Sequence, residues 1–185
     1  FVDGGISIEW MKKAGTKVQN LLTKGSMNHL THQLKKSPEQ HFAEIAKIIS
    51  LAKENDIQTN IYLEDWSNGM KNSPEYVFQF LDFLATQPVK RILLPDTLGV
   101  LIPSQTFEFI SKITAKYHAH NDYDLSVANV LEAVKAGING LHVTVNGMGE
   151  RAGNAPIESV VAVLNDFMPE VKIKIKESSL YSVSK

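Results

Sequence analysis

Short β-prone runs alternate regularly with longer runs of helical spacing along this chain, and few folds accommodate such an order. The β-prone runs predict strands over Lys17 to Leu22, Gln58 to Glu64, Arg91 to Asp96 and Gly140 to Asn146. The other runs predict helices over Pro38 to Asn55, Pro74 to Gln87, Pro103 to Tyr117, Ser126 to Gly137 and Pro156 to Phe167. Strand-helix units that recur after about 30 residues favour right-handed crossovers and a parallel α/β sheet.

Several of the predicted helices open with a start signal, as two examples illustrate, and one of these two also shows a core face. Ser37-Pro38-Glu39 and Ser73-Pro74-Glu75 each place a proline and an acid in a first turn. Within the second of these helices, an apolar cluster at helical spacing predicts core packing rather than a binding face. The cluster comprises Phe78, Phe80, Phe83 and Leu84.

A (β/α)8 barrel and an open doubly wound sheet both satisfy this order of elements. Polar residues follow successive strands at their carboxyl ends, where barrel enzymes place their catalytic groups, so the barrel is favoured. Complete barrels typically need about 250 residues, and about five or six βα units are predicted here. We therefore expect residues 1–185 to form a single, partial catalytic barrel domain, truncated at both ends, with no first strand before its glycine-rich start.

The charge balance, the length of the apolar runs and the cysteine content indicate which kinds of partner the chain can bind. With 19 basic and 20 acidic residues, the formal net charge is −1, which predicts neither nucleic acid nor membrane binding and favours small-molecule chemistry. No apolar run approaches the roughly 18 residues of a membrane span. The absence of cysteine excludes thiolate ligands and fits a cytoplasmic location.

His118 and His120 predict a metal site. Side chains of a strand repeat every second residue, so both imidazoles project from the same side of the backbone at a predicted strand end. A lone histidine is more often an ordinary surface or core residue, but the pair and the adjoining Asn121-Asp122 favour a divalent ion. Asp122 is a candidate outer-shell carboxylate that fixes an imidazole tautomer.

Gly147 to Asn154 forms a glycine-rich loop ahead of the last predicted helix. A plain βα turn explains the glycines, and glycine richness alone is weak evidence for phosphate binding. The loop also carries Glu150, Arg151 and Asn154. The amide oxygen of Asn154 is a candidate metal ligand or support, and Arg151 is a candidate to order the loop or to meet an anion.

Polar residues at two other strand ends are weaker candidates. Glu64 and Asp65 point to opposite faces, and Glu64 is a candidate general base, although two acids ahead of a loop are usually a solvated turn. Thr97 is a candidate to bind a substrate carboxylate, and an N-cap-like role is equally consistent with the sequence. His29 and His32 are expected to be solvated or locally hydrogen bonded, not a second metal site.

Three segments, HAHNDYDLSVAN, NGMGERAGN and LPDTLG, resemble the metal-dependent barrel acyltransferases that include 2-isopropylmalate, homocitrate and citramalate synthases. The resemblance runs from Phe1 to about Phe167. Two further segments, NLLTKGS and IYLEDWSNG, are most similar to citramalate synthase.

The resemblance implies a Claisen condensation of acetyl-CoA with a 2-oxo acid, in which a divalent metal (Mg, Mn or Zn) polarises the 2-oxo carbonyl. It also implies a role for each matching position. His118, His120 and Asn154 are metal ligands, Glu64 is the base or its orienting partner, Thr97 holds the 2-oxo acid carboxylate, and Leu22 and Tyr62 line the pocket for the pyruvate methyl group. The expected reaction is pyruvate to citramalate in amino-acid biosynthesis, with 2-oxoisovalerate, the substrate of leucine biosynthesis, as the alternative.

Departures from the family lead to further expectations. The first strand, which supplies an arginine and an aspartate ligand, and the C-terminal regions have no counterpart here, so we expect this polypeptide to be inactive alone and the full-length enzyme to be a homodimer. The family has an apolar strand just before the histidine pair, whereas the predicted helix runs almost directly into His118. We therefore expect that strand to be short or built from Lys112 to Tyr117. A lyase of the same barrel type is disfavoured, because such lyases place a cysteine in the glycine-rich loop. A noncatalytic metal-binding barrel fragment is the alternative from another class.

Overall fold

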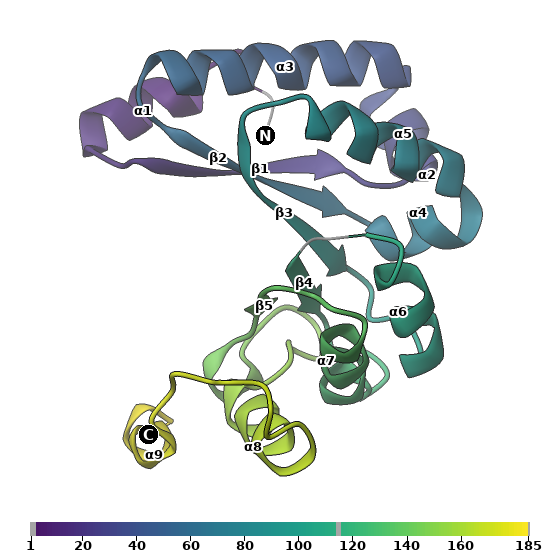
Figure 1. The fold of residues 1–185 in the computed structure, drawn as a ribbon. Coiled ribbons are helices and arrows are strands. Elements are labelled where there is room, and N and C mark those ends of the chain that lie inside the picture. Colours follow the sequence, from purple (N-terminus) through teal and green to yellow (C-terminus); the bar gives the residue numbers. More distant parts are fainter. Residues whose placement is uncertain (1–2, 114–115, 185) are drawn as a thin grey trace. The chain divides into compact units, whose positions relative to one another are not determined.

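The structure is a computed structural model that describes residues 3–113 and 116–184. The chain divides into two compact units, residues 1–95 and 96–185. In both units, β-strands are followed by α-helices along the chain (Figure 1).

The first unit contains three strands, and β1 pairs in parallel with β2, which pairs in parallel with β3. Its elements are α1 (Ile6–Ala14), β1 (Val18–Lys24), α2 (Met27–His29), the π-helical turn η1 (Leu30–Leu34), α3 (Pro38–Glu54), β2 (Gln58–Glu64), α4 (Trp66–Asn72), α5 (Pro74–Ala85) and β3 (Val89–Asp96). The register places Leu22 opposite Tyr62 and Lys24 opposite Glu64. Because parallel strands end at the same edge, these pairs lie together at the carboxyl end.

The two faces of the β1–β2 pair differ in burial. Leu21, Thr23, Ile61 and Leu63 are buried, and α3 packs on β2 and on α5 (Figure 1). The alternate residues project from the other side and are only half-buried; we call this side the open face and define it by Leu22, Lys24, Tyr62 and Glu64. The period of two along each strand therefore separates core residues from candidate site residues.

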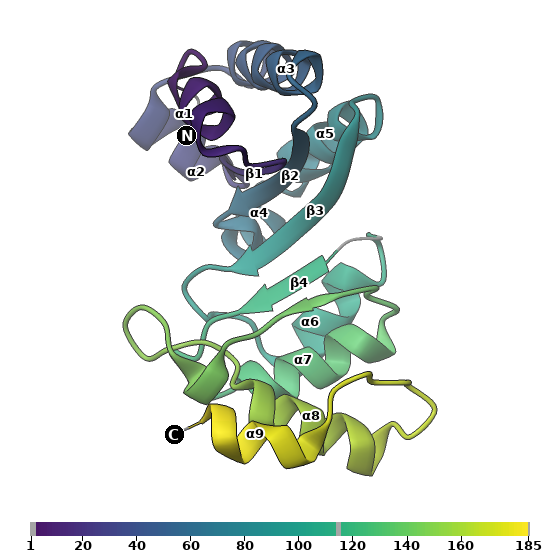
Figure 2. The ribbon, with the colours of Figure 1, turned by 90° about the vertical axis from the view of Figure 1, so that its left-hand side faces the viewer.

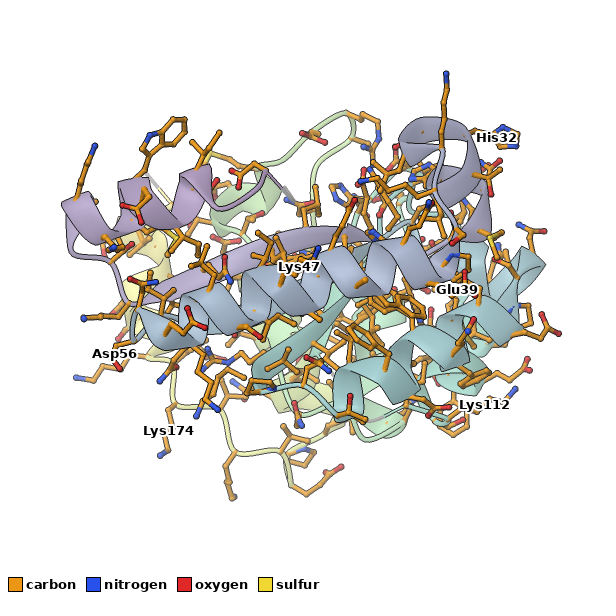
Figure 3. All side chains as sticks on the ribbon, turned by 90° about the horizontal axis from the view of Figure 1, so that it is seen from above. His32, Glu39, Lys47, Asp56, Lys112 and Lys174 are labelled. Carbon is orange, nitrogen blue, oxygen red and sulfur yellow. The ribbon has the colours of Figure 1, made fainter. Side chains whose placement is uncertain are left out.

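The predicted helix starts are confirmed in α3 and α5. In α3 the Ser37 hydroxyl accepts a hydrogen bond from the Gln40 amide, and the Gln40 side chain accepts one from the Ser37 amide, which forms a capping box. Pro74 is the first residue of α5. Helix α3 also carries exposed polar residues, including Glu39 and Lys47, which Figure 3 labels along the helix.

The predicted aromatic core face is correct except at Phe78. Phe80 and Leu84 are fully buried, and the Phe80 and Phe83 rings both stack on Phe42, at centroid distances of 5.0 and 4.9 Å. Phe78 is exposed, so its prediction as a core residue is wrong. On a helix of 3.6 residues per turn, position 78 lies about 200° from position 80, which turns it away from the core.

The second unit contains one short parallel pair, in which Tyr117 of β4 lies opposite Leu141 of β5 and His118 opposite His142. Its elements are α6 (Pro103–Ile110), β4 (Lys116–Ala119), α7 (Ser126–Lys135), β5 (Leu141–His142), the 3-10 turn η2 (Val145–Gly147), α8 (Ile157–Phe167) and α9 (Glu177–Val183). Helix α7 contacts β4, α6 and α8 (Figure 2).

The structure corrects two predicted elements in this unit. The helix predicted over Pro103 to Tyr117 ends at Ile110, and residues 114 and 115 lie outside the described part. Tyr117 is a fully buried strand residue, so the alternative of a short strand directly before His118 is correct. The strand predicted over Gly140 to Asn146 is limited to Leu141–His142, and the turn η2 begins at Val145. Within that turn, Asn146 has a φ of 55°, outside the β region. At Tyr117, strand pairing with Leu141 outweighs the helical spacing of the preceding sequence.

Parallel strands joined by helices confirm the α/β class in both units. Helix α1, which the sequence pattern did not predict, packs Ile8 against Ala52 and Ile57. Within residues 3–113 and 116–184, no helix is long and apolar enough to cross a membrane. The single-domain prediction for residues 1–185 stays a prediction.

Candidate metal centre

Strand β4 brings the two predicted histidine ligands together. His118 is its third residue and is buried, and His120 follows the strand by one position. Their rings lie 4.9 Å apart between centroids, with an interplanar angle of 84°. Both imidazoles therefore occupy the same side of the backbone, as the spacing predicts.

The hydrogen bonding of His118 leaves one ring nitrogen available. Its Nδ1 lies 3.0 Å from the backbone carbonyl of His142. A carbonyl only accepts, so Nδ1 carries the proton in the neutral ring and Nε2 carries the lone pair. Burial lowers the pKa of His118 to about 4. The ring is neutral near pH 7, which is the form that coordinates metals.

His120 has a similar electrostatic environment and an unsatisfied nitrogen. Burial lowers the pKa of His120, and the positive charge of Arg151 acts in the same direction. Its Nδ1 is buried and has no hydrogen-bond partner among the described residues. A buried ring nitrogen without a partner is costly, and in the tautomer with the proton on Nε2 a cation bound at Nδ1 would satisfy it.

Asn154 presents an amide oxygen to the same region. Its backbone forms an isolated bridge with His120, and its Nδ2 donates to the Met148 carbonyl at 3.0 Å. The Oδ1 atom is buried and has no partner among the described residues. Gly149 permits this arrangement, because a Cβ at that position would lie 2.3 Å from the Asn154 Nδ2.

These donors fit a divalent metal as a partial ligand set. Two neutral imidazoles and one amide oxygen are ligand types accepted by Mg, Mn and Zn. No group of three or more His, Cys, Asp or Glu side chains with metal-binding geometry occurs in the described residues. Any ion held by His118, His120 and Asn154 therefore needs further ligands, such as water or substrate.

Arg151 links the glycine-rich loop to two other loops of the same unit. Its Nε and Nη2 donate to the two carboxylate oxygens of Asp122 at 2.7 and 2.8 Å, and Nη2 also donates to the Thr97 carbonyl at 2.5 Å. These hydrogen bonds hold the pKa of Asp122 below its usual value. Asp122 thus binds the arginine, not an imidazole as the sequence had indicated.

The remaining predicted residues lie on the open face of the first unit. Leu22 and Tyr62 are register partners there. Two residues further along both strands, the Lys24 ammonium forms an ion pair with the Glu64 carboxylate. Burial raises the pKa of Tyr62. The structure therefore brings Leu22, Tyr62 and Glu64 together in one unit and His118, His120, Asn154 and Thr97 in the other.

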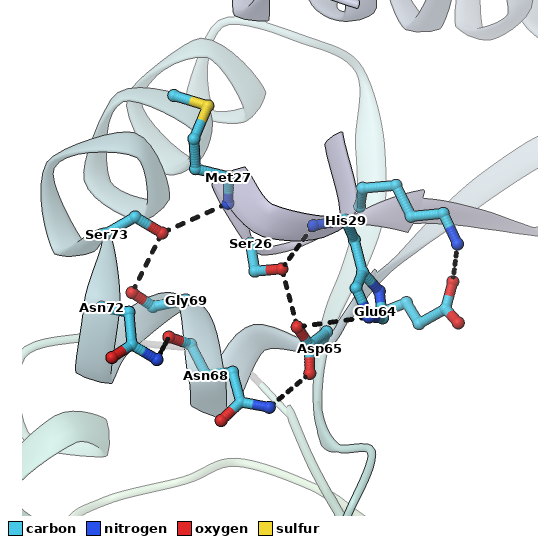
Figure 4. Close-up of polar contacts among 10 residues, drawn as sticks. Ser26, Met27, His29, Glu64, Asp65, Asn68, Gly69, Asn72 and Ser73 are labelled. Atoms are coloured by element: carbon cyan, nitrogen blue, oxygen red, sulfur yellow. Dashed lines mark hydrogen bonds and ion pairs between the residues drawn. The ribbon is translucent and has the colours of Figure 1, made fainter. Parts of the chain in front are cut away.

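A buried polar network beside Glu64 was not predicted. Asp65 is buried in a left-handed conformation, with a φ of 64°, and accepts hydrogen bonds from Ser26 Oγ at 2.7 Å and Asn68 Nδ2 at 2.8 Å (Figure 4). The His29 Nε2 lies 3.5 Å from its Oδ2. A pocket of about 310 Å³ adjoins the network. Only the pairing of β1 with β2 brings these residues together.

His29 and His32 therefore differ. The expectation that His29 is solvated or hydrogen bonded only locally is wrong, because its Nε2 lies 3.5 Å from Asp65. His29 follows β1 and Asp65 follows β2, so the contact is not local. His32 is exposed and points away from the ribbon, as predicted (Figure 3).

The chain belongs to the HMGL-like family, which matches residues 7–185. It is 35% identical over 162 residues to 2-isopropylmalate synthase of Methanocaldococcus jannaschii, covering 84% of this chain and 30% of that protein. It is 33% identical over 172 residues to (R)-citramalate synthase CimA of the same organism, covering 90% of this chain and 34% of that protein. The predicted family resemblance is confirmed.

A solved structure with the same fold is hydroxymethylglutaryl-CoA lyase from Pseudomonas aeruginosa. The TM-score is 0.82 at 18% identity, and the likeness covers 95% of this chain and 63% of the lyase. At this identity the likeness shows the fold alone, and it confirms that the chain forms part of an α/β barrel. The chain spans about a third of the length of the two synthases.

Proposed function

We propose that this chain is part of the catalytic domain of an acyltransferase that condenses acetyl-CoA with a 2-oxo acid, with pyruvate as substrate and citramalate as product. The observation that carries the proposal is the cluster of His118, His120 and Asn154, whose neutral imidazoles and unpartnered amide oxygen suit a divalent cation. The relatives named as citramalate and 2-isopropylmalate synthases support this reaction class.

In this proposal, His118, His120 and Asn154 would hold the metal. When bound, a divalent ion supplies Lewis-acid polarisation of the 2-oxo carbonyl. His118 is oriented for this role by its Nδ1 hydrogen bond to the His142 carbonyl, which fixes the tautomer. The bridge between His120 and Asn154 holds the other two donors in place before any ligand arrives.

Glu64 would act as the base, or orient it, and remove a proton from the methyl group of acetyl-CoA. Its carboxylate lies on the open face of β2 and is held by the Lys24 ammonium. Thr97, at the end of β3, would bind the carboxylate of the 2-oxo acid through its hydroxyl. The Thr97 backbone is fixed by the Arg151 guanidinium. Such fixed donors favour catalysis because little reorganisation is needed during the reaction.

Leu22 and Tyr62 would select the 2-oxo acid. They are neighbours on the open face, and two bulky side chains leave room for the methyl group of pyruvate rather than the isopropyl group of 2-oxoisovalerate. Discrimination of this kind is worth about 1–3 kcal/mol per methylene in an apolar pocket. The preference for pyruvate is therefore the most specific statement in the proposal, and 2-oxoisovalerate is the alternative substrate.

The proposal extends to the complete protein. We propose that it is cytoplasmic and homodimeric, and that the 185-residue chain alone lacks activity because its described ligand set is incomplete. A noncatalytic metal-binding fragment is the alternative of another class, and it also predicts metal binding by His118 and His120. The two alternatives differ in catalysis, because only the acyltransferase should release CoA from acetyl-CoA.

The test uses the natural protein that contains this segment. CoA release is measured with acetyl-CoA, Mg²⁺ or Mn²⁺, and either pyruvate or 2-oxoisovalerate. We expect release with pyruvate in preference, loss of activity in His118→Ala, and normal activity in the matched control His32→Ala, whose side chain is exposed. Absence of release with both 2-oxo acids would refute the acyltransferase.

A further inference from the structure

The glycine-rich loop is joined to the end of β4 by its backbone. The Asn121 amide donates to the Gly153 carbonyl at 2.9 Å, and His120 and Asn154 lie opposite each other as a bridge pair. These contacts fix two candidate metal ligands relative to each other. They do not reach the loop after β3, which carries Thr97.

A side chain makes that third connection. The loop after β3 passes close to Asp122, because a Cβ on Gly99 would lie 2.8 Å from the Asp122 amide nitrogen. The Arg151 guanidinium then donates to both carboxylate oxygens of Asp122 and to the Thr97 carbonyl. Two of its nitrogens therefore tie three loops at one point. The planar fork of arginine binds a carboxylate through two nitrogens at once, whereas a lysine ammonium donates from a single nitrogen.

This connection places a fixed positive charge beside the candidate metal centre. Arg151 lies three positions before the candidate ligand Asn154, and its ion-pair partner Asp122 lies two positions after the candidate ligand His120. A divalent cation held by these ligands is therefore subject to the fields of both charges. An arginine without its carboxylate partner would repel the ion, and the Asp122 carboxylate offsets this repulsion while both members are present.

We propose that Arg151 is a positioning residue that holds the Thr97 loop against the metal-binding loops, and that Asp122 cancels the guanidinium charge toward the metal. This inference rests on the metal site of the proposed function. It predicts that the two members of the pair are not equivalent. Loss of Asp122 leaves the guanidinium with only the solvent-exposed Glu150 carboxylate, 3.7 Å from its Nη1, as a counter-charge. Loss of both members removes the positive and the negative charge together.

The test measures Mn²⁺ affinity of the 185-residue chain by electron paramagnetic resonance of the free ion. The variants are Asp122→Asn, Arg151→Met and the double variant. Asp124→Asn removes the same charge from the same loop and is the matched control, because Asp124 hydrogen bonds to Asn121 and not to Arg151. Asparagine tolerates the left-handed backbone that Asp124 adopts.

We expect Asp122→Asn to weaken Mn²⁺ binding by about 10-fold, the effect of one uncompensated charge near a divalent ion at intermediate dielectric. The double variant should bind more tightly than Asp122→Asn, and Asp124→Asn should stay within about 2-fold of the unmodified chain. Equal affinity of Asp122→Asn and the double variant would overturn the inference while leaving the metal site intact. No Mn²⁺ binding by the unmodified chain would overturn the metal site and, with it, the charge-cancelling role.

A second measurement tests the positioning role without metal. In amide hydrogen exchange, Arg151→Met and Arg151→Lys should both increase the exchange rate of the Gly99 amide, which lies in the loop that the guanidinium holds. Arg91→Met is the control, because Arg91 is the other arginine of the chain and is exposed on β3. Unchanged exchange in both Arg151 variants would overturn the positioning role.

Discussion

Lys24 and Glu64 are register partners at the carboxyl ends of β1 and β2, and their side chains form an ion pair on the open face. The two residues are 40 positions apart in the sequence. Their side chains are only 12% and 24% exposed, so the pair is less screened than a surface ion pair. The candidate base is therefore held by a neighbour that only strand pairing supplies.

This pair predicts a measurable coupling energy. Lys24→Met and Glu64→Gln should each destabilise the chain, and a double-mutant cycle in urea should give a coupling of about 1 kcal/mol, at the upper end for partly exposed pairs. The exposed pair Lys112–Glu108 on and after α6 is the matched control, with an expected coupling of about 0.3 kcal/mol. Equal couplings at the two sites would contradict the protected environment of Lys24 and Glu64.

Stability should fall as the pH is lowered from 7 to 4. His41 is buried, its Nε2 accepts the Lys24 amide at 3.3 Å, and burial lowers its pKa from 6.5 to about 4. A lowered pKa in the folded state stabilises the protein above pH 6.5, and this contribution is lost as the pH falls toward 4. The shift corresponds to up to about 3 kcal/mol, and His118 acts in the same direction.

The variant His41→Gln isolates this contribution, because glutamine can accept the same amide hydrogen bond but does not titrate. The free energy of unfolding should then depend less on pH between 7 and 4 than in the unmodified chain. His32→Gln, at an exposed position, should leave the pH dependence unchanged. Parallel curves for the unmodified chain and His41→Gln would exclude His41 as the titrating group.

The glycine at position 149 should be essential for the Asn154 ligand. In Gly149→Ala the new Cβ would lie 2.3 Å from Nδ2 and 2.6 Å from Cγ of Asn154, so the amide must leave its place. We expect metal affinity to fall by about 10-fold or more, since losing one ligand interaction of 1.4 kcal/mol already gives a factor of ten. Met148→Ala, in the same loop and exposed, is the control for a general loop effect. Similar losses in both variants would argue against a specific role for Gly149.

The Asp65 network should contribute to stability more than to substrate binding. Asp65→Ala removes the acceptor for Ser26 and Asn68 and places a Cβ residue other than Asn or Asp at a φ of 64°. Together these effects should cost about 3 kcal/mol. Asp65→Asn keeps the tolerated backbone and one acceptor and should cost about 1 kcal/mol, measured by urea unfolding. If both variants unfold at the same urea concentration as the unmodified chain, the network contributes little to stability.

Part of the site could be predicted because it depends on local spacing. The His118 and His120 pair needs only the two-residue repeat of a strand, and the predicted starts of α3 and α5 need only a serine, a proline and an acid in sequence. The prediction failed where tertiary pairing decided the outcome. Tyr117 belongs to a pattern that fits a helix, but it is a strand residue because it pairs with Leu141.

By itself, the sequence determined the order of strands and helices, the α/β class and the shared side of the two imidazoles, because backbone periodicity acts between near neighbours. The tertiary structure alone decided which distant side chains meet. Arg151 binds Asp122, 29 residues away, and Lys24 binds Glu64, because strand register and loop path set those distances. No local pattern encodes a contact whose geometry depends on the pairing of separate strands.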